Sequence, residues 1–388
     1  MNILVAPNAL KGSLGPIEAA GAIAEGLAQG YPDARLDELP IADGGDATAA
    51  VLVRALGGTF AEATAQDPLG RSRKASFGIF GDGNEAVIEV AQSSGLALLA
   101  PMEQNPLAAS SYGAGQLVLA ALERGCRRID IALGGSATVD GGAGLVEALG
   151  VRLLDGNGDV VARGGGGLLQ LEHIDVAGLD SRVAKADIVA LCDVDNALLG
   201  DAGAARAFGP QKGATPEGVE RLEANLAHFA DIIERDLRRD VRHLRHGGAA
   251  GGIGAAVAGI LGGHLAPGAD FVLERLNVRE RLAGKDVVVT AEGQLDRQTL
   301  QNKAPWALAR AARAMGIPVI VLAGGIAEEV EVDREAFHLF DIMVPACPRP
   351  MALAEAMRTA REQLVASARR VGQLLRLGGA VAVARRVP

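Results

Sequence analysis

The chain has 388 residues, 49% of them hydrophobic, which is enough for a large core and suggests two domains or one elaborate domain. A net charge of −9 and an aromatic content of only 3% argue against nucleic-acid binding, because few rings are present on which bases could stack. Acidic ligands are not excluded, since local cations, N–H groups or a divalent metal can outweigh the overall field.

The three cysteines Cys126, Cys192 and Cys347 lie far apart in apolar or strand-like surroundings. Their spacing suggests neither a disulfide framework nor a cysteine-based zinc site, which favours a reducing compartment. The sequence begins directly with a strand pattern, and no apolar run approaches membrane-spanning length. We therefore expect a cytoplasmic protein that does not span a membrane.

The first sixty residues alternate between strand and helix patterns. The patterns predict strands over 3–6 and 35–42 and helices over 17–29 and 47–56. Such a βαβα start is typical of a parallel sheet covered by helices.

The pattern changes after residue 58, where alternating residues and turn sequences predict antiparallel hairpins over 59–90. Further along, the patterns predict strands over 129–133 and 188–192, a glycine-rich loop over 164–167, and helices over 113–124, 143–149, 216–239 and 249–263. Parallel-sheet patterns return after residue 286, with strands predicted over 287–290, 319–322 and 342–345, a helix over 304–315, and further helices to about residue 377.

The two ends of the chain thus resemble each other, whereas the middle differs. We expect an α/β protein in which both chain ends, residues 1–65 and 285–388, form a Rossmann-like parallel-sheet domain. Residues 66–284 are expected to form an inserted mixed α/β domain, with a cleft between the two domains.

The segment with the most informative composition is 134–142, Gly-Gly-Ser-Ala-Thr-Val-Asp-Gly-Gly, which follows an apolar strand and precedes a helical pattern. Glycines let backbone N–H groups converge on an oxyanion, and Ser136 and Thr138 add hydroxyl donors. The helix expected over 143–149 would direct its positive N-terminus at the same ligand. The segment matches neither the P-loop nor the dinucleotide-binding glycine pattern. Glycines also end strands for conformational reasons alone, but the combination favours an anion site.

Polar segments follow six further predicted strands, and in a parallel sheet such segments gather at one edge. They are Asn8 with 11–13, 43–46, 193–196, 292–296, 324–325 and 348–350. Together with 134–142, they resemble the bacterial glycerate kinase family that phosphorylates D-glycerate with ATP, and the resemblance covers about residues 1–360. The matching stretches are 6–14, 41–46, 105–107 with 110–115, 134–142, 192–194 with Asn196, 208–215, and 292–299 with 303–305.

The chain departs from the usual family pattern at a few positions. Asn8-Ala9-Leu10 stands where the family usually has Asp-Ser-Phe, and Val139 stands where it has asparagine. Three further departures are Ala47, Ala197 and Ala291. These changes put Asn8 and Val139 in doubt as ligand contacts but leave the charged positions in place.

The resemblance implies an ATP- and Mg²⁺-dependent kinase that forms phosphoglycerate, most simply 2-phosphoglycerate, in the organic-acid metabolism of glycerate and glyoxylate. Phosphoryl transfer needs donors around the phosphates, a metal and a group that orients the attacking hydroxyl. The candidates for phosphate and nucleotide binding are Gly134, Gly135, Ser136, Thr138, Gly141, Lys212 and Lys303. Asp193 and Lys11 are the catalytic candidates, and we expect Asp193 to follow a buried strand, where a carboxylate is costly without a metal or a cation.

Asp43, Glu292 and Asp296 are the candidate Mg²⁺ ligands, because this ion is satisfied by few carboxylates plus waters and phosphates. Asp43 could equally cap the helix that follows it, and so could Asp140. Arg71 is the candidate for the glycerate carboxylate, since a guanidinium matches it bidentately, with Ser110 and Asn196 as further substrate contacts. The expected partners are D-glycerate and ATP, without nucleic acid or membrane, in a monomer or homodimer.

Two other functions remain open from the residues alone. Glycine-rich strand-to-helix turns also occur in NAD(P)-dependent oxidoreductases of small hydroxy acids, but Glu38 lies too far after Gly12 to be a persuasive ribose ligand. A non-catalytic sensor of sugar acids could use the same anion site without turnover.

Overall fold

The computed structural model of the chain describes residues 1–296, 299 and 303–384. Residues 297, 298 and 300–302 of the polar stretch 292–305 lie outside the described residues. The described chain divides into two compact units, Met1–Asp43 with Ala269–Pro388, and Gly44–Gly268. These boundaries differ from those expected at residues 65 and 285, and the assignment of domains stays a prediction.

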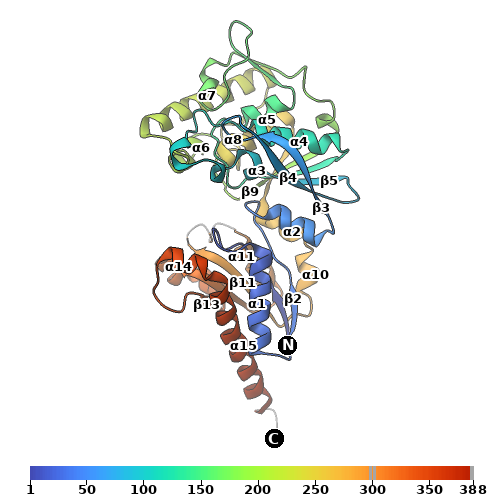
Figure 1. Cartoon of the computed structure of the whole chain (residues 1–388), viewed down its shortest axis with the longest axis vertical. Helices are drawn as coiled ribbons and strands as arrows, with labels where there is room; N and C mark the ends of the chain where they lie inside the picture. Colours follow the sequence, from blue (N-terminus) through green and yellow to red (C-terminus); the bar gives the residue numbers. More distant parts are fainter. Residues whose placement is uncertain (297–298, 300–302, 385–388) are drawn as a thin grey trace. The chain divides into compact units, whose positions relative to one another are not determined.

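The first unit is built around a parallel sheet to which both ends of the chain contribute (Figure 1). Within the described residues its strand order is β13-β12-β11-β1-β2, and every neighbouring pair is parallel. The strands are β1 (Asn2–Val5), β2 (Arg35–Glu38), β11 (Val287–Leu295), β12 (Val319–Ile326) and β13 (Ile342–Pro345). Ile3 pairs with Val287 and with Leu36, so the N-terminal strand lies between a C-terminal strand and β2.

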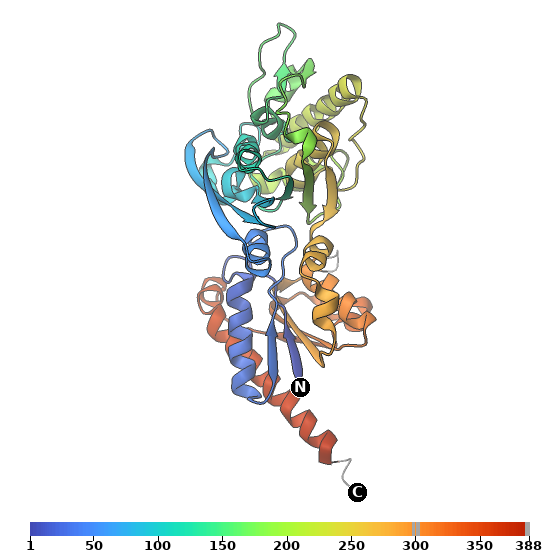
Figure 2. The same cartoon turned by 90° about the vertical axis from the view of Figure 1, so that its right-hand side faces the viewer.

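The helices of this unit follow the apolar patterns of the sequence. They are α1 (Pro16–Gly30), α9 (Gly268–Arg275), α10 (Val278–Leu282), α11 (Ala304–Ala314), α12 (Glu328–Glu331), α13 (Arg334–Leu339), α14 (Leu353–Arg358) and α15 (Ala360–Ala384). At the start of α1, Pro16 fixes the first turn and the Glu18 carboxylate accepts the Gly15 N–H at 3.2 Å. Buried Ile23 and Leu27 of α1 and Leu364 and Ala368 of α15 share one core, and the two helices lie side by side in both views (Figure 2).

The second unit contains a mixed sheet with the described strand order β10-β9-β6-β5-β4-β3. Its strands are β3 (Thr59–Gln66), β4 (Ser72–Phe80), β5 (Glu85–Glu89), β6 (Arg128–Ala132), β9 (Asp187–Cys192) and β10 (His264–Pro267). Neighbours from β10 to β5 are parallel, whereas β5, β4 and β3 pair antiparallel, as the alternation over 59–90 predicts. A small separate hairpin pairs β7 (Arg152–Leu154) with β8 (His173–Asp175).

The helices of the second unit pack around this sheet. They are α2 (Thr48–Ala55), α3 (Ala91–Ser94), α4 (Tyr112–Glu123), α5 (Ala143–Ala148), α6 (Ala204–Phe208), α7 (Pro216–Leu237) and α8 (Ala249–Ala256). Short turns of 3-10 helix occur at Leu96–Leu98, Pro101–Glu103, Gly167–Gln170, Val183–Lys185 and Pro210–Lys212, and a π-helical turn at Val257–Leu261. At the start of α7 the Thr215 hydroxyl accepts the Gly218 N–H at 3.1 Å and caps the helix, which begins at Pro216 as the sequence predicts.

The α/β class, the parallel sheet formed by both chain ends and the inserted mixed sheet are confirmed. Two element predictions were wrong in detail. The strand expected over 35–42 ends at Glu38, and the continuous helix expected over 249–263 is broken, because Ala250, Gly251 and Gly252 have left-handed φ angles of 53°, 69° and 100°. Among the described residues, no helix combines the length and the apolar character that crossing a bilayer requires.

Candidate functional site

Charged side chains gather at the carboxyl ends of the parallel strands in the first unit. Lys11 follows β1, Asp43 follows β2, Glu292 lies near the end of β11 and Lys303 precedes the first residue of α11. Lys11, Glu292, Asp296 and Lys303 line one cavity of about 400 Å³. The sequence prediction that these segments meet is therefore supported for this unit.

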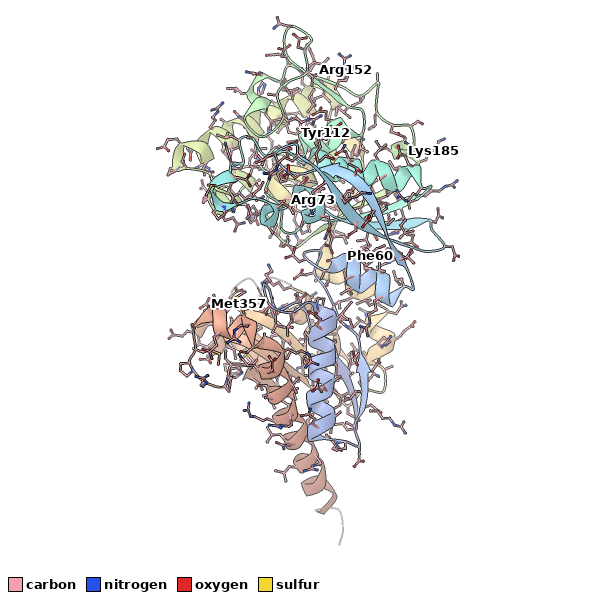
Figure 3. All side chains as sticks on the ribbon, in the orientation of Figure 1. Phe60, Arg73, Tyr112, Arg152, Lys185 and Met357 are labelled. Atoms are coloured by element: carbon pink, nitrogen blue, oxygen red, sulfur yellow. The ribbon has the colours of Figure 1, made fainter. Side chains whose placement is uncertain are left out.

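Apolar side chains from α14 and α15 form part of the wall of this cavity. Met357, labelled in Figure 3, lines it together with Leu353 and Ala360. A pocket with an apolar wall and a few charged groups is the usual form of a small-molecule site. Lys11 is exposed at its rim, whereas Lys303 and Glu292 are largely buried.

Glu292 is the most strongly perturbed acid of this cluster. Its Oε1 pairs with Lys303 Nζ at 3.1 Å, and its Oε2 accepts the Thr299 hydroxyl at 3.1 Å. Burial raises the pKa of Glu292 to about 7, and the charge of Asp43 adds to the rise, while Lys303 and Thr299 oppose it. The carboxyl group is thus held where it can gain or lose a proton near neutral pH.

The pKa of Lys303 is also raised, but for a lysine a raised pKa favours the charged form. Burial by itself lowers the pKa of Lys303, but Glu292, Asp296 and Asp43 outweigh it and hold the pKa above its usual value. Lys303 therefore stays charged, at the head of α11, where a cation is unfavourable unless acids or an anion compensate it.

Asp43 is buried, and its Oδ2 accepts the side-chain N–H of Asn8 at 3.1 Å. Its side chain does not cap α2, because the residue before that helix is Ala47, which has a left-handed φ of 66°. Asn8, which was doubted as a ligand contact, thus has a different role that sequence reasoning missed, since it holds one of the acids in place.

The three candidate metal ligands do not form a complete cage. Within the described ranges, no group of three or more His, Cys, Asp and Glu side chains is arranged to hold a metal ion. The charge of Asp43 nevertheless raises the pKa of Glu292, so two buried carboxylates repel each other across this cluster. A divalent cation would relieve that repulsion, and this donor set fits an ion that takes only one or two carboxylates.

In the second unit, Lys212 fastens the 134–142 loop that follows β6. Its Nζ donates to Ser136 Oγ at 3.0 Å and to the Thr138 carbonyl oxygen at 2.8 Å. The side chain is only 4% exposed, and burial lowers the pKa of Lys212 to about 8, opposed by the charges of Asp140 and Asp193. Its contacts hold the loop, and its expected contact with phosphate stays a prediction.

A left-handed turn in α8 packs against the same loop. The Gly141 N–H donates to the Gly251 carbonyl oxygen at 2.9 Å, and a Cβ on Gly251 would lie 1.9 Å from the Thr138 oxygen. Only glycine permits this backbone contact, so the loop is held by Lys212 and by this turn.

The outer end of the loop keeps donors available. Gly135 is exposed and has a left-handed φ of 71°. In the part of the chain that the structure describes, the N–H groups of Gly135 and Ser136 donate to no protein acceptor. Successive N–H groups at such a turn can form an anion-binding concavity.

The helix after the loop does not contribute as expected. We expected α5 to direct its positive N-terminus at the anion, but it has only six residues. The buried carboxylate of Asp140 already accepts the N–H groups of Gly142 at 3.1 Å and Gly144 at 3.3 Å. This corrects the helix-dipole argument and bears out the alternative that Asp140 caps the helix, while buried Val139 belongs to the core.

Asp193 lies directly after β9, as predicted, but its side chain is exposed rather than buried. The argument from the cost of burying a carboxylate is therefore wrong. Its charge still opposes the lowering of the pKa of Lys212, the lysine that holds the loop. An exposed carboxylate keeps access to a ligand.

The three candidate acceptor contacts already have protein partners. Arg71 pairs with Asp67 and, at 2.7 Å, with Glu103. The Ser110 hydroxyl accepts the Tyr112 N–H at 3.2 Å. The Asn196 amide donates to the Ala202 carbonyl oxygen at 2.6 Å. Arg71 is half exposed, so its guanidinium would have to exchange partners to hold glycerate. Their roles as substrate contacts stay predictions.

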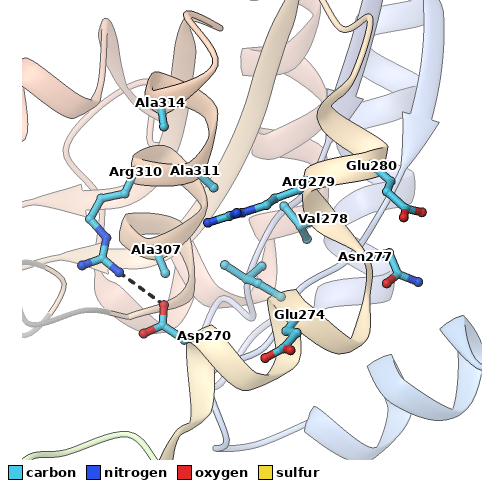
Figure 4. Close-up of a pocket in the computed structure, with 11 residues that line it drawn as sticks. Asp270, Glu274, Asn277, Val278, Arg279, Glu280, Ala307, Arg310, Ala311 and Ala314 are labelled. Atoms are coloured by element: carbon cyan, nitrogen blue, oxygen red, sulfur yellow. Dashed lines mark hydrogen bonds and ion pairs between the residues drawn. The ribbon is translucent and has the colours of Figure 1, made fainter.

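The first unit also contains a larger hollow of about 740 Å³ lined by α9, α10 and α11, shown in Figure 4. Asp270 and Arg310 form an ion pair of 3.3 Å at one side of it, and Arg279 extends across it. None of the residues predicted from the sequence lines this hollow.

The fold and these two clusters define an α/β protein with a charged cavity in one unit and a glycine-rich loop with open N–H groups in the other. Residues 3–376 match the profile of the glycerate kinase family, a family of phosphotransferases, and the chain belongs to that family. The match spans nearly the whole chain, so both units are included.

Individual relatives agree with this assignment. A glycerate kinase of Bacillus subtilis is 42% identical over 97% of this chain and 98% of the relative. A glycerate 2-kinase of Escherichia coli is 41% identical over 97% and 99% of the two chains. A crystal structure from Salmonella typhimurium LT2, assigned as a glycerate kinase 2, superposes with a TM-score of 0.85 at 41% identity, covering 98% of this chain and 99% of that one.

Proposed function

We propose that the protein transfers the γ-phosphoryl group of ATP to a hydroxyl group of D-glycerate and forms 2-phosphoglycerate. The observation that carries the proposal is the match, at about 41% identity and almost full length, to proteins named glycerate kinase and glycerate 2-kinase. The relatives lend no support to the oxidoreductase or to the non-catalytic sensor.

The phosphates of ATP are assigned to the 134–142 loop, through Gly134, Gly135, Ser136, Thr138 and Gly141. Because the Lys212 ammonium only donates, Ser136 Oγ accepts from it and keeps its own O–H for another acceptor. The open N–H groups of Gly135 and Ser136 support the same role. Lys212 supplies positive charge behind the loop, and Lys303 supplies it in the cavity of the first unit.

Asp193 is assigned as the group that orients or deprotonates the acceptor hydroxyl. Its exposure and its place at the end of a parallel strand support this role. Lys11, exposed at the rim of its cavity, is assigned to the transferred phosphate, where a mobile cation offsets the charge that develops.

Mg²⁺ would be held by Asp43 and Glu292, with Asp296 nearby, because their mutual repulsion calls for a cation. Bound Mg²⁺ would neutralise phosphate charge during transfer. Two neighbouring residues would prepare these carboxylates for the ion. Lys303 favours the ionised form of Glu292, and Asn8 orients Asp43.

The acceptor contacts are assigned to Arg71, Ser110 and Asn196. Arg71 would bind the glycerate carboxylate by exchanging Glu103, an exposed partner whose loss costs little. We further propose a monomer or homodimer whose partners are small molecules. We place it in the cytoplasm, because the three cysteines are free and form no disulfide.

The deciding experiment incubates the purified protein with ATP, Mg²⁺ and D-glycerate and follows the product by proton-coupled phosphorus NMR. Phosphate on the 2-hydroxyl couples to one proton and gives a doublet, whereas phosphate on the 3-hydroxyl couples to two and gives a triplet. We expect the doublet. A triplet would overturn the assigned position, and no ATP-dependent turnover would overturn the function.

A further inference from the structure

A third hollow, of about 480 Å³, lies in the second unit at the carboxyl end of β5. Its lining comes from the start of α2, from β3 and β4, and from the turn into α3. The side chains that could contact a ligand are Asp46, Phe60, Ser76, Glu89 and Gln92. Of these residues, Asp46 alone belongs to a polar segment, 43–46, that the sequence predicts at the site.

The hollow adjoins the outer end of the 134–142 loop. A Cβ on Gly135 would lie 3.0 Å from Asp46 Oδ1 and 3.1 Å from the Ala91 Cβ, and both Asp46 and Ala91 line the hollow. A ligand whose phosphates bind the open N–H groups of Gly135 and Ser136 can therefore extend its remaining part into this space.

The charge of the lining narrows the class of ligand. Among the described residues, the ionisable groups that line the hollow are two acids, Asp46 and Glu89, without a lysine or arginine. Glu89 is buried and accepts the Ala49 N–H at 2.8 Å, and burial raises the pKa of Glu89, helped by the charge of Asp46. Such a lining repels glycerate and phosphate but accepts a neutral group that carries hydroxyl and amino donors.

An aromatic ring completes the lining. Phe60 on β3, labelled in Figure 3, is 52% exposed in a chain that has only 8 phenylalanines. The face of a base can stack on such a ring. Ser76 and Gln92 add groups that both donate and accept hydrogen bonds at the edge of the hollow.

We propose that this hollow binds the nucleoside part of ATP, with the base on the Phe60 ring and the ribose hydroxyls donating to the Asp46 carboxylate. The proposal rests on the proposed function, which supplies ATP as the phosphoryl donor. It adds the residues that select a nucleotide over a bare polyphosphate.

The ring is tested by calorimetric titration of the whole protein with ATP, comparing Phe60→Ala with Phe337→Ala. Phe337 is a matched control, because it is 57% exposed on α13 and lines none of the three hollows. We expect Phe60→Ala to bind ATP roughly tenfold more weakly or worse, Phe337→Ala to match the wild type, and Phe60→Trp to retain binding. Unchanged ATP affinity in Phe60→Ala would overturn the proposal.

The ribose contact is tested by comparing ATP with 2′-deoxy-ATP and 3′-deoxy-ATP. We expect the wild type to prefer ATP over at least one deoxy analogue and Asp46→Ala to bind all three equally. The control Asp201→Ala, an exposed acid of the same unit, should keep the preference. If Asp46→Ala still prefers ATP over the deoxy analogues, Asp46 does not contact the ribose.

The two proposals fail in different ways. If the wild type turns over D-glycerate but Phe60→Ala and Asp46→Ala keep normal ATP binding and an unchanged KM for ATP, only the nucleoside site is wrong. If these variants lose ATP affinity while the wild type phosphorylates no glycerate, the nucleoside site stands and the acceptor assignment fails. The Phe60→Trp variant shows that a loss in Phe60→Ala comes from the ring and not from misfolding.

Discussion

Lys212 Nζ donates to Ser136 Oγ across 3.0 Å, although 76 residues separate the two positions in the chain. This contact joins the 3-10 turn Pro210–Lys212 to the loop that carries the proposed phosphate contacts. Because the lysine is almost fully buried, it acts on the loop from within the unit, and a ligand at the exposed Gly135 would meet a surface already fixed in place.

Replacing Lys212 by methionine should therefore reduce both stability and nucleotide binding. The change leaves the buried Thr138 carbonyl oxygen and Asp140 without their cation, and we expect a loss of about 2–4 kcal/mol in the free energy of unfolding. Urea unfolding and ATP titration measure the two effects. Lys185→Met, at an exposed lysine of the same unit, should stay within about 0.5 kcal/mol of the wild type. Equal stability of the two variants would argue against a holding role for Lys212.

The left-handed turn in α8 allows a second test, because another glycine shares its backbone angle but not its surroundings. Gly251 has φ 69° and Gly57 has φ 67°, yet a Cβ would meet the Thr138 oxygen at Gly251 and open space at Gly57. We expect Gly57→Ala to cost about 1 kcal/mol from strain alone. Gly251→Ala should cost roughly 3 kcal/mol or more and weaken ATP binding, since the 134–142 loop must move. Similar losses in both variants would mean that the contact with Thr138 is unimportant.

The raised pKa of Glu292 predicts a pH dependence of stability. Its pKa is about 7 in the folded protein against 4.5 ordinarily, so between these values the folded state binds more protons than the unfolded state. The contribution of Glu292 to the stability is complete below about pH 4.5 and is lost as the pH rises through 7. Relative to Glu292→Gln, the wild type should lose roughly 3 kcal/mol across this window.

Urea unfolding at several pH values with a chelator present measures this difference, since a bound cation would favour the ionised carboxylate. The exposed acid Glu329 provides the control, and Glu329→Gln should follow the wild type at every pH. Parallel pH profiles for the wild type and Glu292→Gln would show that Glu292 titrates as an ordinary carboxylate.

Asp193 and Asp195 form a natural pair for testing the proposed base. Both are exposed, but Asp195 pairs with Arg245 at 3.0 Å, whereas the charge of Asp193 acts on Lys212. We expect Asp193→Asn to lower kcat by roughly 10²- to 10⁴-fold with little change in the KM for ATP, as loss of a general base does. Asp195→Asn should remain near the wild type in steady-state kinetics. If kcat is unchanged in Asp193→Asn, another group activates the hydroxyl.

The regular parts of the fold were predictable because their patterns are local. The helical period of α1 and the apolar run of β6 each lie within about fifteen residues, and the predicted bounds agree closely with the observed ones. The turn at Ala250 was not predictable in this way, since an alanine- and glycine-rich stretch carries the composition of a helix. Its left-handed angles are set by the loop against which it packs.

In the candidate site, too, local features were predictable and tertiary contacts were not. Glu292 was identified from its position at a strand end, and Lys303 from its position at the head of a helix. The two lie only 11 residues apart and do pair. The holding role of Lys212 and the contact of Asn8 with Asp43 depend on tertiary structure, and the sequence contains no pattern for either. The exposure of Asp193 was likewise missed, because a buried strand does not determine how deeply the next residue lies.

The position of β1 between β2 and β11 in the parallel sheet has a consequence for synthesis on the ribosome. After its synthesis, β1 must wait for β11, whose first residue is Val287, before it gains its second neighbour. At roughly 5–20 residues per second, that interval lasts on the order of 15 seconds to a minute. All residues of the Gly44–Gly268 unit are made within it, so that unit can complete its own core while β1 and α1 still lack their C-terminal partners. A chaperone that binds nascent chains would find its apolar target in the first thirty residues.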